Sequence, residues 1–158
     1  MRPVVRAADA SDIPILMDLC RRTISASYRS FLGDDAVNNF IESGASDAYV
    51  SEHLPQCWVI VARGSVSGLT VCVEETVDLM MIDEALHRRG LGRELLGWIE
   101  TMLFREHREL RLESYAENRV ANLFYSSRGW IEKDRYRDSE TGLQRVVFTK
   151  TAVPAPTR

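Results

Sequence analysis

Apolar residues change their spacing between residues 57 and 107, and this change limits the chain to folds that pack a sheet against a helix. Residues 57–62 (CWVIVA) form a dense apolar run of the length expected for a buried strand. Strand-like runs follow at 66–73 and 76–82, with connections short enough to favour antiparallel neighbours. From 91 to 107 the apolar residues recur at helical spacing instead, which predicts an amphipathic helix.

Shorter segments before and after this region complete a layered α+β domain. We expect strands at 3–7, 110–115, 130–136 and 143–150, and helices at 13–28, 34–41, 46–54 and 118–127. This order predicts a mixed sheet with helices on both faces. A chain of 158 residues is long enough for one such domain, over residues 1–150, and residues 151–158 are expected to form a flexible tail.

Charge and apolar content argue against several classes of protein. A net charge of −3 gives no overall basic field, so nucleic acid is not an expected partner. No apolar run approaches the roughly 20 residues that a membrane-spanning helix needs, and the N-terminus lacks a signal-peptide core. Cys20, Cys57 and Cys72 form no Cys-x-x-Cys pair and have no histidine at ligand spacing. We therefore expect buried free thiols, no metal site and a cytoplasmic location.

Gly90 and Gly92 flank one residue at the start of the predicted long helix. Glycines there let the backbone come close to a ligand, and the first N–H groups of a helix have no partners within it. Together with the helix dipole and the charges of Arg88, Arg89 and Arg93, they predict a local site for a phosphate or pyrophosphate. The alternative is a turn in which the glycines serve geometry alone and the arginines face solvent.

Two other nucleotide-binding patterns fit this segment less well. A dinucleotide-binding fingerprint needs a third glycine and a strand–helix–strand setting, whereas the strands before Gly90 are expected to form hairpins. A P-loop needs a lysine at this place, and the segment has none.

Two longer patterns identify a family. The first is His87-Arg88-Arg89-Gly90-Leu91-Gly92 with Ile82 upstream, and the second is Asn118-Arg119-Val120-Ala121-Asn122-Leu123-Phe124-Tyr125 followed by Gly129-Trp130. Through them the sequence resembles the GCN5-related N-acetyltransferase (GNAT) superfamily over almost the whole chain. That superfamily shows Gln/Arg-x-x-Gly-x-Gly/Ala in the first pattern, so His87 departs from it, as does Glu84, which stands where a proline is common.

The resemblance implies acetyl-coenzyme A (acetyl-CoA) as cosubstrate, and a mostly antiparallel sheet in which the strand at 76–82 splays from the strand at 110–115. The backbone of Met80 and Ile82 would pair with the pantetheine arm. The pyrophosphate would be held by the segment from His87 through Leu91 and Gly92 to Arg93. Asn118 would contact the pantetheine, cap its own helix, or do both.

The resemblance also implies that Tyr125 is the general acid. A phenol with a pKa of about 10 can protonate a departing thiolate whose pKa is near 8.5. The alternative is an aromatic side chain that packs against the sheet, with Phe124 as its neighbour.

The general base is expected to be Asp78, acting through water. Its spacing from Met80 and Ile82 predicts that it shares their face of the strand. Other nearby carboxylates are Glu74, Glu75 and Glu113. Thr76 occupies the superfamily's usual base position and cannot serve as a base.

The amine acceptor is expected between the first helices and the splayed strands. Its contacts would come from Tyr28, Arg29 and Phe31, from the neighbouring Asp34 and Asp35, and from Glu113.

The predicted function is N-acetyl transfer from acetyl-CoA to a primary amine of a small molecule, peptide or protein, by direct attack in a ternary complex. The alternatives are a non-catalytic acyl-CoA-binding or sensing module, and an acyltransferase for another short acyl-CoA. No membrane partner is expected, and the resemblance leaves room for a homodimer.

Overall fold

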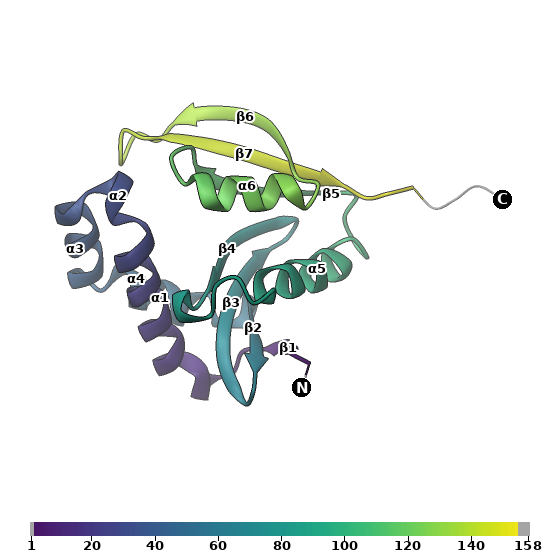
Figure 1. The fold of residues 1–158 in the computed structure, drawn as a ribbon, viewed down its shortest axis with the longest axis horizontal. Coiled ribbons are helices and arrows are strands. Elements are labelled where there is room, and N and C mark those ends of the chain that lie inside the picture. Colours follow the sequence, from purple (N-terminus) through teal and green to yellow (C-terminus); the bar gives the residue numbers. More distant parts are fainter. Residues whose placement is uncertain (1, 155–158) are drawn as a thin grey trace.

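The computed structural model describes residues 2–154 and folds them around one mixed sheet (Figure 1). Its seven strands lie in the order β1-β2-β3-β4-β5-β7-β6, and among the described strands only the β4–β5 pair is parallel. The strands are β1 (Val4–Ala7), β2 (Cys57–Ala62), β3 (Ser65–Val73), β4 (Thr76–Ile82), β5 (Glu109–Tyr115), β6 (Ile131–Arg137) and β7 (Gln144–Thr151). The predicted mixed, mostly antiparallel sheet is confirmed.

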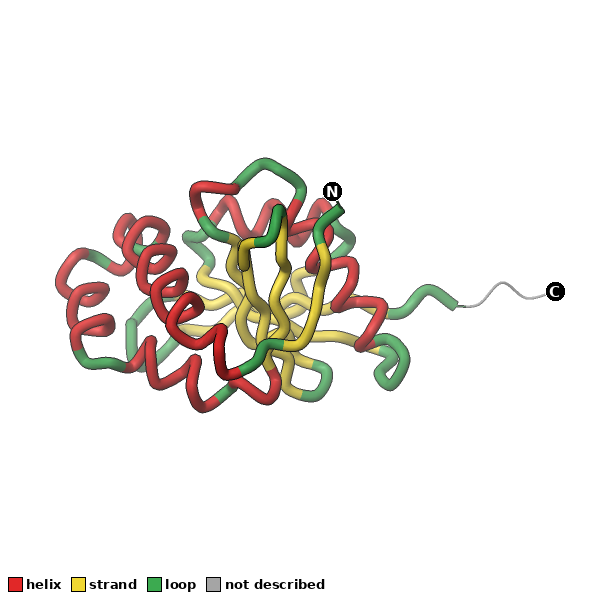
Figure 2. The backbone as a smooth tube through the Cα atoms, turned by 90° about the horizontal axis from the view of Figure 1, so that it is seen from below, coloured by secondary structure: helices red, strands yellow, loops and turns green. Residues whose placement is uncertain are grey.

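Helices cover both faces of this sheet (Figure 2). They are α1 (Ile13–Ser27), α2 (Arg29–Leu32), α3 (Asp34–Glu42), α4 (Ala45–Glu52), α5 (Leu91–Leu103) and α6 (Arg119–Ser127). Helices α1, α3 and α4 form a hydrophobic cluster with β2, β3 and β4 on one side, which we name the α1 face. Helices α5 and α6 pack on the other side, the α5 face, whose cluster includes residues of β5 and β7.

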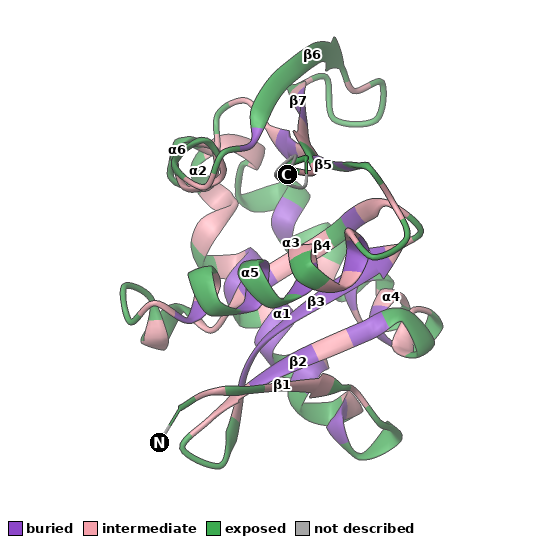
Figure 3. Ribbon diagram, turned by 90° about the vertical axis from the view of Figure 1, so that its right-hand side faces the viewer, coloured by how far each residue is buried: buried purple, intermediate pink, exposed green. Residues whose placement is uncertain are grey.

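The helical spacing of leucines and isoleucines explains how α5 is seated. Leu95, Leu96 and Ile99 lie on one side of the helix and are each at most 1% exposed. Burying a side chain of this size contributes roughly 1.5–3 kcal/mol, so this stripe fixes the helix against the sheet. The position of the first turn of α5, which follows β4, is set by the same packing. In contrast, β6 is exposed along its whole length (Figure 3).

Most predicted boundaries match the structure, and the differences have local causes. The strands at 57–62 and 76–82 have the predicted ends. The helix predicted to reach residue 107 ends at Leu103, and the single turn α2 was not predicted because four residues show no periodicity. β7 runs through Thr151, one residue into the predicted tail, and residues 155–158 of that tail lie outside the described residues.

Strands β4 and β5 are paired over a short stretch and then splay apart (Figure 1). Thr76 lies opposite Arg111 and Val77 opposite Leu112, and the N–H of Arg111 donates to the carbonyl of Glu75 at 3.0 Å. From Leu79 onwards β4 has no strand partner on this side within the described part of the chain. The predicted splayed strand pair is therefore confirmed.

The three cysteines are buried free thiols, as predicted. Burial raises the pKa of Cys20 and of Cys57 to about 12 and that of Cys72 to about 11. The thiols are protonated at neutral pH and make poor nucleophiles. Within residues 2–154 there is no cluster of His, Cys, Asp or Glu that could hold a metal ion, and no helix is long and apolar enough to cross a bilayer.

Candidate active site

The open edge of β4 presents backbone groups in the splay. The N–H of Asp83 donates to the carbonyl of Ser67 on β3 at 2.9 Å, and Met81 lies opposite Leu69 in the same register. Backbone groups alternate in direction along a strand, so Met80 and Ile82 direct theirs away from β3 and into the splay. An extended ligand could pair with these groups as an added strand.

The start of α5 lies beside this edge and supplies unpaired N–H groups. Gly90 precedes the helix with φ 79°, and Arg88 has φ 67°, so the loop enters the helix through left-handed conformations. Among the described residues, no acceptor takes a hydrogen bond from the N–H groups of residues 88–93. Arg88, Arg89 and Arg93 are exposed around them. Unpaired N–H groups, the helix dipole and nearby arginines together suit a phosphate.

At Gly92 the first turn of α5 lies against both α6 and β4. A Cβ atom at this position would lie 3.5 Å from the ring of Phe124 and 3.8 Å from the side chain of Ile82. The unpaired N–H groups of α5 and the open edge of β4 are therefore adjacent, because Ile82 belongs to the edge and also contacts the first turn of α5. One molecule with an anionic group and an extended amide arm fits both features. The residues present thus fit coenzyme A.

His87, which departs from the superfamily pattern, lies against the strand. Its Nε2 is 2.8 Å from the carbonyl oxygen of Ile82, so the imidazole bridges the loop to the open edge of β4. The side chain is exposed beside the α5 N-terminus. Its predicted contact with a pyrophosphate stays a prediction.

Asn118 is the N-cap residue of α6. Its side-chain oxygen accepts a hydrogen bond from the N–H of Ala121 at 3.4 Å, which is the capping role considered from the sequence. The amide nitrogen of the same side chain remains available to a ligand, and the predicted contact with pantetheine stays a prediction.

Tyr125 on α6 combines a packed ring with a free hydroxyl. The ring lies 6.0 Å from that of Phe148 and 6.4 Å from that of Trp130, centroid to centroid. Within residues 2–154 no hydrogen bond of its hydroxyl is among the causes that set its pKa. Burial raises the pKa of this phenol above its usual range, and the nearby Tyr28 adds to the effect. The ring therefore packs against the sheet, as in the alternative interpretation of the sequence. The hydroxyl stays protonated at neutral pH.

Asp78 does not share a face with Met80 and Ile82, so that prediction is wrong. The register between β3 and β4 shifts at this residue, which forms a β-bulge. A bulge breaks the alternation on which the spacing argument relied. The Asp78 carboxylate accepts a hydrogen bond from the hydroxyl of Tyr49 on α4, on the α1 face, whereas Met80 and Ile82 pack on the α5 face.

The predicted acceptor residues divide into two groups. Tyr28 and Phe31 lie together, with ring centroids 5.4 Å apart, and both contact Tyr115 at the end of β5. Arg29 lies apart from them, since its guanidinium donates to Ser25 at 2.9 Å and to Asn38 at 2.8 Å.

Asp34 and Asp35 begin α3, and both are exposed. Asp34 forms an ion pair with Arg29 at 3.3 Å. These two acidic residues lie with Arg29 rather than with the aromatic group.

Glu113 on β5 is held by several partners on the α1 face. Tyr136 donates its hydroxyl hydrogen to one carboxylate oxygen, and Arg111 donates to the other at 3.0 Å. Burial raises the pKa of this carboxyl, but these hydrogen bonds and the charges of Arg111 and Arg145 outweigh it and hold the pKa below its usual range. Glu113 is therefore ionised and engaged, which argues against a role as a free base.

Two residues at this place were not predicted from the sequence. Tyr115 and Arg145 lie opposite each other on β5 and β7, and the Arg145 guanidinium carbon is 4.5 Å from the centroid of the Tyr115 ring. Neither residue belongs to a family pattern. A charged residue next to the apolar run Val146–Phe148 was the available signal, but it does not show which strand lies beside it.

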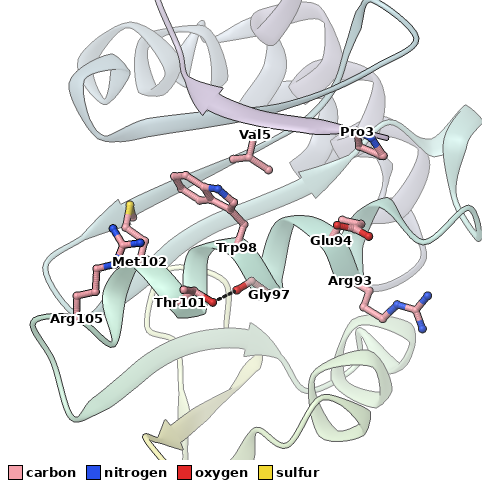
Figure 4. Close-up of a pocket in the computed structure, with 9 residues that line it drawn as sticks. All are labelled: Pro3, Val5, Arg93, Glu94, Gly97, Trp98, Thr101, Met102 and Arg105. Carbon is pink, nitrogen blue, oxygen red and sulfur yellow. Dashed lines mark hydrogen bonds between the residues drawn. The ribbon is translucent and has the colours of Figure 1, made fainter. Parts of the chain in front are cut away.

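A groove of about 410 Å³ lies elsewhere, between β1 and the outer side of α5 (Figure 4). Its walls include Val5 on β1 and Trp98 and Met102 on α5. The groove shares Arg93 with the start of α5 but contains none of the residues at the splay, so it lies beside the candidate site and not within it.

Comparisons with known proteins agree with this geometry. The family model described as "Acetyltransferase (GNAT) domain" matches residues 23–151. No curated protein matches the sequence significantly.

Solved structures show the same fold at low sequence identity. A GCN5-related N-acetyltransferase from Rhodopseudomonas palustris has 15% identity and a TM-score of 0.82, covering 96% of this chain and 97% of the other. The PaiA N-acetyltransferase from Thermoplasma acidophilum, solved in complex with coenzyme A, has 14% identity and a TM-score of 0.80, covering 96% and 100%. The ribosomal-protein-S18-alanine N-acetyltransferase from Escherichia coli has 17% identity and a TM-score of 0.67, covering 98% and 97%. With the family model matching most of its length, the chain belongs to the GNAT family of acetyltransferases.

Proposed function

We propose that this protein transfers an acetyl group from acetyl-CoA to a primary amine by direct attack in a ternary complex. The observation that carries the proposal is the open edge of β4 beside the unpaired N–H groups of α5. The free hydroxyl of Tyr125 packs against the same hydrophobic cluster as Met80 and Ile82. A purely structural turn would not need all three features at one place.

Acetyl-CoA supplies the acetyl group as an activated thioester. The N–H groups of residues 88–93 would hold its pyrophosphate, and the backbone of Ile82 would pair with its pantetheine arm. The N–H of Met80 points into the splay, where it would stabilise negative charge that develops on the acyl oxygen.

In the transfer, a carbon–nitrogen bond forms to the amine and the carbon–sulfur bond breaks. The amine loses one proton, and the leaving thiolate gains one. Tyr125 would donate the proton that the thiolate gains, because the raised pKa of its hydroxyl keeps that group protonated at neutral pH. The same burial that raises the pKa of the phenol also disfavours a charged thiolate beside it and so raises the pKa of the thiol. Because both pKa values rise, the phenol can still protonate the thiolate.

Asp78 would accept the proton of the amine, through water, from the α1 face. Val77 lies opposite Leu112 with both side chains on the α5 face, so the next residues, Asp78 and Glu113, project to the other side. Tyr49 holds the Asp78 carboxylate in place. We expect Asp78→Asn to lower kcat while leaving the KM for acetyl-CoA unchanged.

The experiment is thiol release from acetyl-CoA with a panel of primary amines, alongside titration of coenzyme A binding. We expect release with at least one amine, and a loss of about 100-fold or more in kcat for Tyr125→Phe with coenzyme A affinity retained. Binding of coenzyme A without release for any amine would favour the acyl-CoA-binding module instead. An unchanged rate in Tyr125→Phe would refute the general-acid role. Propionyl-CoA and succinyl-CoA in the same assay test the choice of acyl group.

The location and the oligomeric state are part of the same proposal. Buried, unpaired cysteines suit a reducing compartment, which supports a cytoplasmic location. Size-exclusion chromatography with light scattering would show whether the protein forms the homodimer that its family resemblance allows.

A further inference from the structure

Arg145 lies on β7, the middle strand of β5, β7 and β6, and it projects to the α1 face. It lies opposite Tyr115 of β5 on one side and opposite Tyr136 of β6 on the other. Residues directly opposite one another in antiparallel strands project to the same face, so the guanidinium is flanked by two tyrosines. It is placed 4.5 Å from the centroid of the Tyr115 ring, as in a cation–π contact.

Aromatic side chains from the first helices complete a wall beside it. Phe31 on α2 lies 5.4 Å from Tyr115 and Tyr28 lies 6.2 Å from it, centroid to centroid. Tyr28 ends α1, so this wall joins the helical part of the α1 face to the end of β5. Arg145 therefore stands at the mouth of the splay, on the side opposite α5 and α6.

One donor of the Arg145 guanidinium, the buried Nε, is left without an acceptor among the described residues. The nearest carboxylate, Glu113, is 3.9 Å from this atom, but both of its oxygens already accept hydrogen bonds from Tyr136 and Arg111. A buried, charged donor without an acceptor costs free energy, and a ligand that supplies the acceptor would recover it.

The same place adjoins the proposed general acid. Tyr28 contributes to the raised pKa of Tyr125, and Arg145 and Tyr115 in turn act on the pKa of Tyr28. Tyr115 ends β5, the strand that splays from β4, so a group bound at Arg145 would lie beside the splay where the amine is proposed to react.

We propose that Arg145, stacked on Tyr115 and bordered by Tyr28 and Phe31, binds a carboxylate of the acceptor, so that the acceptor is a primary amine that also carries a carboxylate. A guanidinium presents parallel N–H donors that match the two oxygens of a carboxylate, and a planar anion fits beside the aromatic wall. Glu113 does not oppose such an anion strongly, because Arg111 and Tyr136 already neutralise and cover it. This proposal rests on the proposed function.

The first test compares amino acids with their carboxamides as acceptors at saturating acetyl-CoA. We expect kcat/KM to favour the acids by about 10- to 100-fold, the range for a hydrogen-bonded charge. Arg145→Gln should remove this preference by raising the KM for the acids while leaving the amides unaffected. Arg145→Lys, which keeps the charge and loses the paired donors, should raise that KM less. Equal use of acids and amides by the unsubstituted protein would overturn the proposal, as would a stronger preference for a phosphorylated amine.

Arg135→Gln is the matched control. Arg135 lies on the neighbouring strand β6 and pairs with Glu132 on the protein surface, so its loss should leave the preference for acids intact. A loss of preference equal to that of Arg145→Gln would assign the effect to general surface charge and overturn the proposal. Urea unfolding of each variant checks that the fold is retained.

The second test does not depend on turnover. Carboxylic acids that lack the amine cannot be acylated, and we expect them to bind the coenzyme A complex by calorimetry, with at least tenfold weaker binding to Arg145→Gln. The corresponding amides should bind no better to one protein than to the other. Binding of these acids, together with no thiol release from any amino acid in the first test, would count against acetyl transfer while supporting the carboxylate site. Equal affinity of acids for both proteins would refute the site itself.

Discussion

Gly68→Ala should disturb both the stability of the sheet and the open edge of β4. Gly68 on β3 lies opposite Ile82. A Cβ atom there would lie 2.6 Å from the Ile82 Cδ1, 3.1 Å from the Ile60 Cγ2 and 2.8 Å from the carbonyl oxygen of Met81. The two side-chain ends can rotate away, but the carbonyl belongs to β4. That strand must therefore move.

The expected loss of stability follows from two opposing effects. Overpacking of this kind costs about 1–3 kcal/mol. Replacing glycine by alanine also restricts the unfolded chain, which returns about 0.4–1 kcal/mol. We therefore expect the free energy of unfolding to fall by roughly 0.5–2 kcal/mol, with a weaker affinity for coenzyme A because Ile82 lies on the strand that shifts.

Gly97→Ala is the matched control for this change. Gly97 is an exposed residue within α5, and a Cβ atom there meets nothing within 4 Å. Helix propensity alone should then stabilise the protein by about 0.8–1 kcal/mol, with unchanged coenzyme A affinity. Urea unfolding and calorimetric titration of coenzyme A measure both quantities. If Gly68→Ala proves as stable as the unsubstituted protein and binds coenzyme A equally well, the close approach of β3 and β4 does not position the edge.

Three further changes and one control variant, Gly64→Ala, test the loop at 87–90 and the buried thiol of Cys20. Gly90→Ala and Gly64→Ala both place a side chain at positive φ, 79° and 77°, and each should lower the free energy of unfolding in urea by about 1–2 kcal/mol. Only Gly90→Ala should also weaken coenzyme A binding. Equal affinities of the two variants would contradict a phosphate site at the start of α5. His87→Ala should change coenzyme A affinity less than about fivefold, because its imidazole bonds to Ile82, and a larger loss in calorimetry would show direct contact with the phosphates. The folded-state pKa of Cys20 is raised to about 12, above its unfolded value, so its stabilising contribution is complete below about pH 8.5 and falls by about 1.4 kcal/mol per unit as the pH rises further. Cys20→Ala should remove that slope from urea unfolding between about pH 9 and 10.5, and an unchanged slope would mean that the thiol titrates equally in both states.

The positions of the residues proposed to hold the cofactor could be predicted from the sequence because these residues are local. The glycines before α5 and the residues of α6 each occupy one continuous segment, so their spacing carries the geometry. The backbone directions of Met80 and Ile82 follow from the alternation of a single strand. The error at Asp78 arose in the same strand, because the sequence of β4 does not reveal the bulge that its pairing with β3 creates.

The acceptor side could be predicted only in part, because it depends on pairing between distant strands. Arg145 becomes a candidate once the register places it between Tyr115 and Tyr136, and no pattern in the chain encodes that register. Tyr28 and Phe31 were found from their loop, but the same loop also contributes Arg29, which turns to Ser25 and Asn38 instead. Which way each side chain turns is decided by tertiary packing.

The splay of β4 from β5 gives the site two sides, and this makes the proposed roles separable by kinetics. Gly90 and Ile82 belong to the side covered by α5, so changes there should act on the KM for acetyl-CoA. Arg145 lies on the opposite side, so its loss should act on the KM for the acceptor. Tyr125 on α6 is the residue proposed to act on the thioester, and it packs against the cluster that contains Met80 and Ile82. A variant of Tyr125 should therefore lower kcat while leaving both KM values close to those of the unsubstituted protein, which is the signature of a group that acts on the transition state rather than on either ligand.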